Sequence, residues 1–288
     1  MLPIINISRF LSRHPLTRHE LLKAWIRFAG WQIRSRLHEE VLFPWVGGQF
    51  LAVRRGMTGA TGNIYAGLHE FPDMMVVLHF LRKGDLFLDI GANVGSYTVL
   101  SAGVCQARTW AFEPDPNTMK HLKRNIAINR LDDRVLIYEC ALGATRDEIL
   151  FTSGLDTTNK VVTGDNKNTN TVLIHQERLD YITDSIYTPN MMKIDVEGYE
   201  ENVLKGSLKT VENEALKVIE LETVSPWIED MLLANCFHRV YYDPFSRKLH
   251  DQKPMALQSS NSLYVRDLSF VSARLAEAQA IEIFGHLI

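Results

Sequence analysis

GDLFLDIGANVGSYTVLSAGVCQARTWAFE, residues 84–113, predicts a strand, a glycine-containing turn, a helix and a second strand in succession. The apolar run at 86–90 lies between Gly84 and Gly91, as expected of a short strand buried on both faces of a parallel sheet. Because glycine has no Cβ, Gly91 and Gly95 allow a sharp turn and let a ligand approach the N–H groups at the start of the helix. The stretch therefore predicts an α/β fold with a ligand site at the carboxyl end of its first strand.

Two acidic residues accompany this turn and indicate which ligand it binds. Asp89 lies within the first strand, and Glu113 follows the second strand, where a carboxylate can accept hydrogen bonds from both hydroxyls of a ribose. The turn G-x-N-x-G at 91–95 departs from the dinucleotide pattern G-x-G-x-x-G in its middle glycine and its spacing, so a pyrophosphate would fit poorly. S-adenosylmethionine has no phosphate and needs one acid for its amino-acid end and one for its ribose. We therefore predict this cofactor, and a tight turn in some other α/β protein is the open alternative.

Four further segments extend the pattern beyond the turn. They are AFEPDPNT at 111–118, LKRNIAIN at 122–129, ALG at 141–143 and KIDVEGYEENVLKG at 193–206. Together with DIGANVG at 89–95 they resemble the FkbM family of S-adenosylmethionine-dependent methyltransferases, over residues 62–265; KIDVEG followed by E-x-x-V-L-x-G is the most specific part. The resemblance implies an α/β fold of the class I methyltransferase (Rossmann-like) type, with a mostly parallel seven-stranded sheet and helices on both faces. It also implies O-methylation, often of a sugar hydroxyl on a glycan or a natural product.

The resemblance places the cofactor at the turn, at the ribose acid and at the end of the third strand. The residues implied are Asp89, Gly91, Asn93, Gly95, Glu113, Cys140 and Ala141. In class I methyltransferases the turn after the third strand meets the edge of the adenine, commonly through an acid, whereas this chain has Cys140 there. We therefore expect backbone groups to contact the adenine, and the alternative for Cys140 is the role of a small buried hydrophobic residue.

Three acids are predicted at the carboxyl ends of the fourth and fifth strands. Asp195 and Glu197 follow the fourth strand and Glu222 the fifth, at the edge of the sheet where α/β proteins bind ligands. Methylation of a hydroxyl needs a general base. Asp195 is the first candidate for this base and Glu197 the second. His69 is the third, because it is a neutral base near physiological pH. Neighbouring acids should raise the pKa of one of the carboxyl groups, which would make it a better base at neutral pH. The three acids could instead hold a divalent cation, although we expect no metal.

Residues that bind the methyl acceptor are predicted in two places. In the resembled family the glycine-dotted stretch at 56–73 runs along the cofactor and the acceptor. The segment 147–178 predicts two extra strands joined by a polar loop, which would hydrogen-bond a sugar and cover it as a lid. Ordinary loop packing and a solvated loop are the respective alternatives. The acceptor residues predicted from these places and from the fifth strand are Tyr65, Glu70, Asp156, Asn159 and Glu222, with Thr158 beside them.

The chain is expected to consist of a central domain with two extensions. Residues 1–61 form an N-terminal helix and β-hairpin extension, residues 62–267 the methyltransferase domain, and residues 268–288 a C-terminal amphipathic helix. The last strands of the domain, at 237–243 and 262–265, are expected to be an antiparallel pair at the edge of the sheet, joined by a loop.

The N-terminal helix is predicted at residues 17–40, opened by Thr17 with Glu20 in a capping-box pattern and followed by the hairpin at 41–55. Its apolar residues recur at helical spacing and are expected to pack on the chain's own domain. Its Lys and Arg residues leave a second hypothesis open, peripheral contact with an anionic membrane or a partner. The apolar face consists of Leu22, Trp25, Ile26, Ala29, Ile33 and Leu37.

Composition excludes some classes of protein. The 288 residues, 46% of them hydrophobic, suffice for one large or two small domains, and the net charge of −3 disfavours a nucleic-acid substrate. Cys105, Cys140 and Cys236 are widely spaced and unsuited to a complete set of disulfides, which points to a reducing cytoplasm. The sequence contains neither an apolar run of the roughly 18 residues that a membrane span needs nor a signal-peptide pattern at its start.

Two other functions remain open at this stage. An NAD-dependent oxidoreductase acting on a nucleotide sugar would use the same fold, but the missing middle glycine argues against it. A non-catalytic module that binds S-adenosylmethionine or a glycan would not need the full set of Asp89, Glu113 and Asp195. The partner that we predict is a small-molecule or glycan acceptor, and the oligomeric state is not predicted.

Overall fold

The computed structural model describes residues 2–152, 159–161, 170–183, 187–254, 259 and 261–288. Of the predicted acceptor residues, Asp156 and its neighbour Thr158 lie outside this part of the chain. In the described part, no helix combines the length and the apolar character that crossing a bilayer requires.

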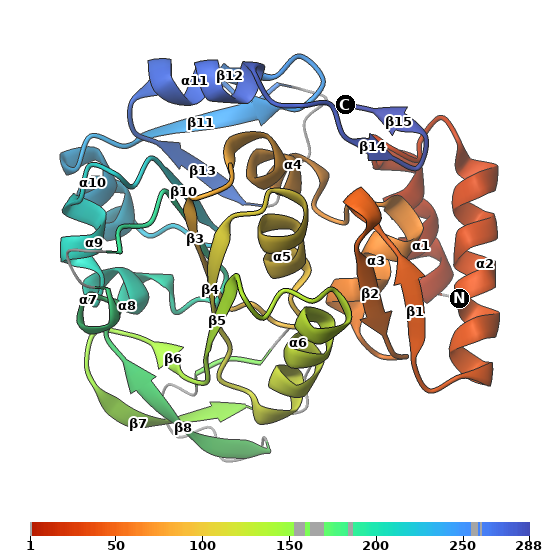
Figure 1. The fold of residues 1–288 in the computed structure, drawn as a ribbon, viewed down its shortest axis with the longest axis horizontal. Coiled ribbons are helices and arrows are strands. Elements are labelled where there is room, and N and C mark those ends of the chain that lie inside the picture. The colour runs from red at the N-terminus through yellow and green to blue at the C-terminus, as the bar shows by residue number, and fades with distance from the viewer. Residues whose placement is uncertain (1, 153–158, 162–169, 184–186, 255–258, 260) are drawn as a thin grey trace.

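An eight-stranded sheet forms the centre of the molecule (Figure 1). Its order is β12-β11-β13-β10-β9-β3-β4-β5, and β13 is antiparallel to both of its neighbours, β10 and β11. The adjoining pairs among β3, β4, β5, β9 and β10 are parallel, so the predicted mostly parallel α/β sheet of the class I methyltransferase type is confirmed. The strands are β3 Leu86–Ile90, β4 Arg108–Phe112, β5 Val135–Tyr138, β9 Met191–Ile194, β10 Val218–Leu221, β11 His238–Asp243, β12 Lys248–His250 and β13 Ser262–Val265.

The eighth strand, β12, lies in the segment that we expected to be a loop between the last two strands. The chain after Asp243 turns tightly through Arg247, which has a φ of 55°, and returns antiparallel to β11 with Asp243 opposite Lys248. The expected antiparallel pair of β11 and β13 is confirmed, but β12 occupies the edge of the sheet.

Helices cover both faces of the sheet, as expected (Figure 1). One face packs against α4, α5, α6 and α11, and the other against α7 to α10. Strand β3 shows the alternation that two buried faces require, because Phe87 joins the first core while Leu88 and Ile90 join the second. The helices are α4 Phe71–Phe80, α5 Ser96–Val99 continued by the π-helix Leu100–Val104, α6 Pro116–Ile128, α7 Leu179–Ile182, α8 Glu200–Lys205, α9 Leu208–Glu212, α10 Pro226–Ala234 and α11 Leu268–Ala276.

A second, three-stranded sheet of order β6-β8-β7 lies near the lower end of the central sheet in Figure 1. It contains the two extra strands that we predicted, which pair antiparallel with Asp147 opposite Gln176, and β6 adds to it in parallel. Its own small core, Phe151 and Ile174 with Ala141, is separate from the two cores of the main sheet. The strands are β6 Ala141–Leu142, β7 Asp147–Thr152 and β8 Thr171–Glu177.

The N-terminal extension contains two helices where one was predicted. Thr17 does not start a helix: it is buried in the connection between them, and its hydroxyl donates to the Leu11 carbonyl at 2.6 Å. Glu20 precedes the second helix but its side chain makes no capping bond, so the capping-box prediction is wrong. The predicted hairpin is confirmed, and the glycine-dotted stretch after it includes an unexpected helix. The elements are α1 Leu2–Arg13, α2 Leu21–Leu37, β1 Val41–Pro44, η1 Val46–Gly48, β2 Phe50–Val53 and α3 Thr58–Ala66.

The C-terminal tail is a helix only over its first half. Helix α11 ends at Ala276, and the chain then forms a hairpin of β14 Glu282–Ile283 and β15 His286–Leu287. Phe284 and Gly285 both have positive φ, 53° and 85°, the pattern of a tight two-residue hairpin turn. Ile283 and Ile288 are buried in the first core, so the last apolar residues of the tail reach the core through this hairpin and not through a continued helix.

Candidate active site

The carboxyl ends of β3, β4, β9 and β10 converge on one region, and the turn after β3 is held closely against the end of β9. Gly91 has a φ of 83°, and a Cβ placed on it would lie 1.9 Å from the carbonyl oxygen of Asp195. Gly95 has a φ of 91°, and its Cβ would meet Leu122 of α6 at 2.6 Å. Both glycines are therefore required by left-handed backbone and by close packing, as the sequence indicated.

Glu113 is fixed at the end of β4 by the backbone of two loops. Its carboxylate accepts hydrogen bonds from the N–H groups of Asn93 and Asp115, each at 2.9 Å. Burial raises its pKa to about 7, against the opposing effect of these N–H donors. Each carboxylate oxygen can accept more than one hydrogen bond, so both remain able to receive the hydroxyls of a ribose.

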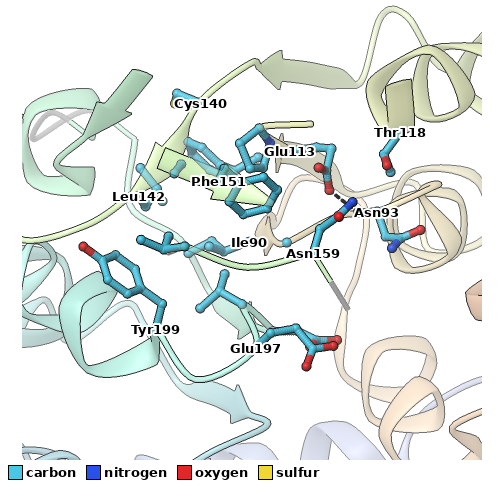
Figure 2. A pocket seen from close by; sticks show the side chains of 17 residues that line it. Ile90, Asn93, Glu113, Thr118, Cys140, Leu142, Phe151, Asn159, Glu197 and Tyr199 are labelled. Carbon is cyan, nitrogen blue, oxygen red and sulfur yellow. Dashed lines mark hydrogen bonds between the residues drawn. The ribbon is translucent and has the colours of Figure 1, made fainter. Parts of the chain in front are cut away.

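A cavity opens beside Glu113 and contains most of the predicted cofactor residues (Figure 2). Gly91, Asn93, Glu113, Cys140 and Ala141 all line it, in an empty space of about 590 Å³ that includes open solvent. Burial raises the pKa of the Cys140 thiol to about 12, so the residue is a neutral, apolar part of the wall. The apolar side chains that line the cavity are Ile90, Phe112, Leu142, Phe151, Val161 and Val196.

The second sheet also contributes to this cavity. Asn159, predicted to bind the acceptor, lines it instead beside Glu113, and its side-chain amide donates to Asp115 at 3.3 Å. Thr118 and Tyr199 are further polar residues of the lining. The described residues of the β7–β8 segment that line this cavity are Phe151, Asn159 and Val161, and a lid over the acceptor stays a prediction.

A second, larger cavity adjoins the first and contains the catalytic candidates. The two share Gly91, Asn93, Asp195 and Glu197 in their linings, so they lie next to each other at the ends of β3 and β9. The second has about 1060 Å³ of empty space, open solvent included. The remaining polar and titratable residues that line it are Thr58, His69, Glu70, Asp89, Ser96, Tyr97, Lys193 and Glu222.

Asp89 lies at the inner end of this cavity with almost no exposure to solvent. It is 1% exposed and accepts a hydrogen bond from the Thr98 hydroxyl at 2.5 Å. Burial raises its pKa, while the nearby Lys193 ammonium opposes that rise. Asp89 thus belongs to the wall of this cavity, with very little of its surface exposed to it.

Asp195 and Glu222 form a coupled pair with opposite pKa shifts. Burial alone would raise the pKa of Asp195, but the Lys193 ammonium, 2.6 Å from its Oδ2, outweighs burial and holds the pKa below its usual range. Glu222 is hydrogen-bonded to Asp195, and burial together with the neighbouring negative charge raises its pKa to about 7. The carboxyl group with a raised pKa that we expected among these acids is therefore Glu222.

The other two base candidates differ in their surroundings. Glu197 is half-buried and has a φ of 55°, and its partial burial raises its pKa. Burial lowers the pKa of His69, which favours its neutral form. Carboxylate oxygens of Asp195, Glu197 and Glu222 lie within 4.8 Å of one another, a spacing at which three hard oxygen ligands could hold a cation.

Tyr65 is not where the sequence placed it. It lies in α3, is 6% exposed and packs edge-to-face on Phe28 of α2, with ring centroids 5.2 Å apart. Among the described residues it contributes to the lining of neither cavity, because α3 turns it toward the N-terminal helices.

Lys193 is a site residue that sequence analysis did not select. Its side chain is 3% exposed, and its ammonium lies 4.5 Å from the centre of the Tyr97 ring as well as against Asp195. The charges of Asp195, Glu70, Asp89 and Glu220 outweigh its burial and raise its pKa. The available signal was a lysine in the apolar run MMKI, since lysine is rarely buried without a charged partner.

A buried polar network continues from Lys193 into the sheet. The Tyr97 hydroxyl donates to Glu70 at 2.8 Å and lies 3.3 Å from Glu220, whose Oε1 also accepts from the Asn261 amide at 2.8 Å. Burial raises the pKa of Glu220 well above its usual range, against the opposing effect of the Lys193 charge. The network ties α4, α5, β9 and β10 to the inner wall of the second cavity.

Comparison with known proteins agrees with this geometry. The family model for the methyltransferase FkbM domain matches residues 89–237, which include both acids of β3 and β4 and all of β9 and β10. Hexuronic acid methyltransferase AglP from Haloferax volcanii is 26% identical over 151 residues, 51% of this chain and 59% of the relative. The chain thus matches less than two thirds of the length of this curated relative.

Solved structures with similar folds include two methyltransferases. The methyltransferase FkbM of Methylobacillus flagellatus has a TM-score of 0.44 and 19% identity, over 66% of this chain and 47% of that one. The precorrin-6Y C5,15-methyltransferase of Geobacter metallireducens has a TM-score of 0.42 and 12% identity, over 75% of this chain and 95% of that one.

Proposed function

The chain belongs to the FkbM methyltransferase family, and from this premise we propose that it transfers the methyl group of S-adenosylmethionine to a hydroxyl oxygen of a sugar in a glycan or natural product. The observation that carries the proposal is the pair of adjacent cavities, one beside the fixed Glu113 and the other around Asp195 and Glu222. The relative named as a hexuronic acid methyltransferase supports a sugar as the acceptor.

The residues of the first cavity and Asp89 suit the parts of this cofactor. Glu113 would accept hydrogen bonds from the ribose, Cys140 and Ala141 would lie along the adenine, and the buried Asp89 would face the amino group. When bound, the cofactor supplies an electrophilic methyl group on a sulfonium. The protein's own task is to hold the acceptor oxygen in line with that group and to remove the proton of the hydroxyl.

We assign removal of the proton to Glu222 and orientation of the hydroxyl to Asp195. Lys193 keeps Asp195 ionised, so the proton shared by the two carboxyl groups belongs to Glu222. A base with a pKa of about 7 is well matched to neutral pH, since it is largely free to accept a proton and still basic enough to take one. Glu197 and His69 stay the second and third candidates for the base.

Calorimetric titration with S-adenosylhomocysteine, and separately with NAD⁺, tests the proposal. We expect S-adenosylhomocysteine to bind and NAD⁺ not to bind. Glu113→Gln should weaken S-adenosylhomocysteine about tenfold or more, because hydrogen bonds to a charged acceptor contribute roughly 1.5–3 kcal/mol. Glu212→Gln, an exposed acid at the end of α9, is the matched control and should leave the affinity unchanged. Binding of NAD⁺ alone would overturn the proposal and favour an oxidoreductase.

A further inference from the structure

Helix α2 presents a row of large aliphatic side chains to solvent. Leu22 is 76% exposed, Ile26 62%, Ile33 61% and Leu37 72%. With the exposed Ala29 they recur every three or four residues and so lie on one side of the helix. We call these five residues the α2 stripe.

The α2 stripe is not the face by which the helix packs on the protein. Ala24, Trp31 and Ser35 are the buried residues of α2, and Trp25 and Phe28 pack partly against the core. The structure therefore reverses most of the sequence prediction, because five of the six apolar residues expected to face the domain face outward. Figure 1 shows α2 at the outer edge of the molecule, with α1, α3 and the β1–β2 hairpin on its inner side. A contiguous exposed apolar row of this kind indicates an interaction surface.

The charges around the α2 stripe are mostly positive, although Lys23 pairs with Glu20 at 2.7 Å. Residues 2–38 contain seven Lys and Arg residues and one acid, Glu20, whereas the remaining chain has 24 Lys and Arg against 33 Asp and Glu. Lys23 and Arg34 are exposed along one border of the stripe and Arg36 along the other. The N-terminal helices are thus a basic, apolar region on an otherwise acidic protein.

We propose that α2 docks through this stripe on the surface of an anionic phospholipid bilayer. An amphipathic helix with aliphatic residues on one face and Lys and Arg at its borders lies in the plane of such a surface, with the aliphatic residues among the acyl chains and the cations at the headgroups. A second copy of the chain would bring the same cations against one another. A nucleic acid would satisfy the cations but would leave the aliphatic row without an apolar partner.

Helix α1 connects this surface to the second cavity. Phe10 of α1 and His14 directly after it line a recess together with His69 and Glu70, and these last two residues also line the cavity around Asp195. If the proposed methyl transfer is correct, an acceptor carried on a membrane lipid would reach the site along this side of the protein. That consequence depends on the proposed function, whereas the docking itself does not.

Vesicle flotation of the full chain tests the docking. The probes are vesicles of phosphatidylcholine alone and vesicles with phosphatidylglycerol added. We expect the protein to float with the anionic vesicles at low salt, and less so with neutral vesicles or at high salt. Leu22→Gln/Ile26→Gln should lower the partition coefficient at least about tenfold, because it removes two aliphatic side chains from the acyl region. Arg34→Gln/Arg36→Gln should lower it about tenfold or more for anionic vesicles only.

Leu233→Gln is the matched control, since Leu233 is a half-exposed leucine of α10 on the opposite side of the molecule in Figure 1. It should float like the wild type. Absence of flotation, or equal flotation of the stripe variants, would overturn the proposal. So would a concentration-dependent dimer that the Leu22/Ile26 variant dissociates, or RNA binding that depends on Arg34 and Arg36 alone. Titration with S-adenosylhomocysteine tests the proposed function separately, because the stripe variants should bind S-adenosylhomocysteine with the wild-type affinity.

Discussion

Replacement of the buried Lys193 by Met should destabilise the protein, and most strongly at alkaline pH. The Lys193 ammonium lies 2.6 Å from Asp195, and its side chain is 3% exposed. Removal of one partner of a buried ion pair typically costs about 3–5 kcal/mol, because it leaves the other charge buried without compensation. We expect a loss of this size in the free energy of unfolding at pH 8, measured by urea denaturation.

The pH dependence follows from the carboxyl groups that remain. In the wild type Lys193 keeps the pKa of Asp195 below its usual range, so Asp195 contributes stability above its unfolded pKa of about 3.9 and loses it as the pH falls. In Lys193→Met burial should dominate and raise the pKa of Asp195 above its unfolded value. The unfolded chain then releases a proton that the folded chain retains, so the variant loses stability as the pH rises. The deficit relative to wild type should therefore be smaller at pH 5 than at pH 8.

Lys205→Met supplies the control for this measurement. Lys205 also pairs with an acid, Glu201, at 2.8 Å, but on the surface of α8. Such an exposed pair contributes about 0–1 kcal/mol, and its loss should not depend strongly on pH. The reasoning would be refuted if Lys193→Met cost no more than Lys205→Met, or if its cost were the same at pH 5 and pH 8.

Further predictions concern the acids, the turn and a cation. Glu222→Gln should lower the rate of methyl transfer about 100- to 10,000-fold in a radiolabelled-methyl assay. The wild-type rate should fall as the pH drops below about 7, where Glu222 becomes protonated, and a rate independent of pH would contradict its assignment as the base. Gly91→Ala should unfold at a lower urea concentration than Gly84→Ala. Both glycines have positive φ, but only at Gly91 would a Cβ meet backbone, the Asp195 carbonyl oxygen at 1.9 Å. If both variants lost the same amount of unfolding free energy, about 1–2 kcal/mol, close packing at Gly91 would be unimportant. Methyl transfer should persist in a chelator, because Lys193 already pairs with Asp195. Loss of methyl transfer in the chelator, restored by Mg²⁺, would instead place a cation among Asp195, Glu197 and Glu222.

The sequence predicted best where a structure depends on neighbours along the chain. The strand, turn and helix around Gly91 and the acid after β4 were all predicted correctly, since glycine conformations and strand ends are local properties. The tail beyond Ala276 was predicted as helix because its apolar spacing fits one, but Phe284 and Gly285 turn the chain into a hairpin that buries Ile283. Local periodicity cannot distinguish these outcomes when both bury apolar residues.

The acidic residues show the same division. Asp195 and Glu222 were selected from the sequence because they follow predicted strands, but which of them has the raised pKa depends on a lysine two residues before Asp195 whose side chain reaches it inside the sheet. The network of Tyr97, Glu220 and Asn261 joins residues up to 164 positions apart, from Tyr97 to Asn261, and no local pattern connects them.

By itself the sequence determined the α/β class, the succession of strands along the chain and the position of the acids at the carboxyl ends of those strands. Side-chain periodicity and glycine spacing are encoded residue by residue. Only the tertiary structure decided which of those acids has the raised pKa and that the α2 stripe faces outward. A pKa depends on distances and burial that arise between remote segments, and the inner face of a helix with two apolar faces is chosen by the elements that pack against it.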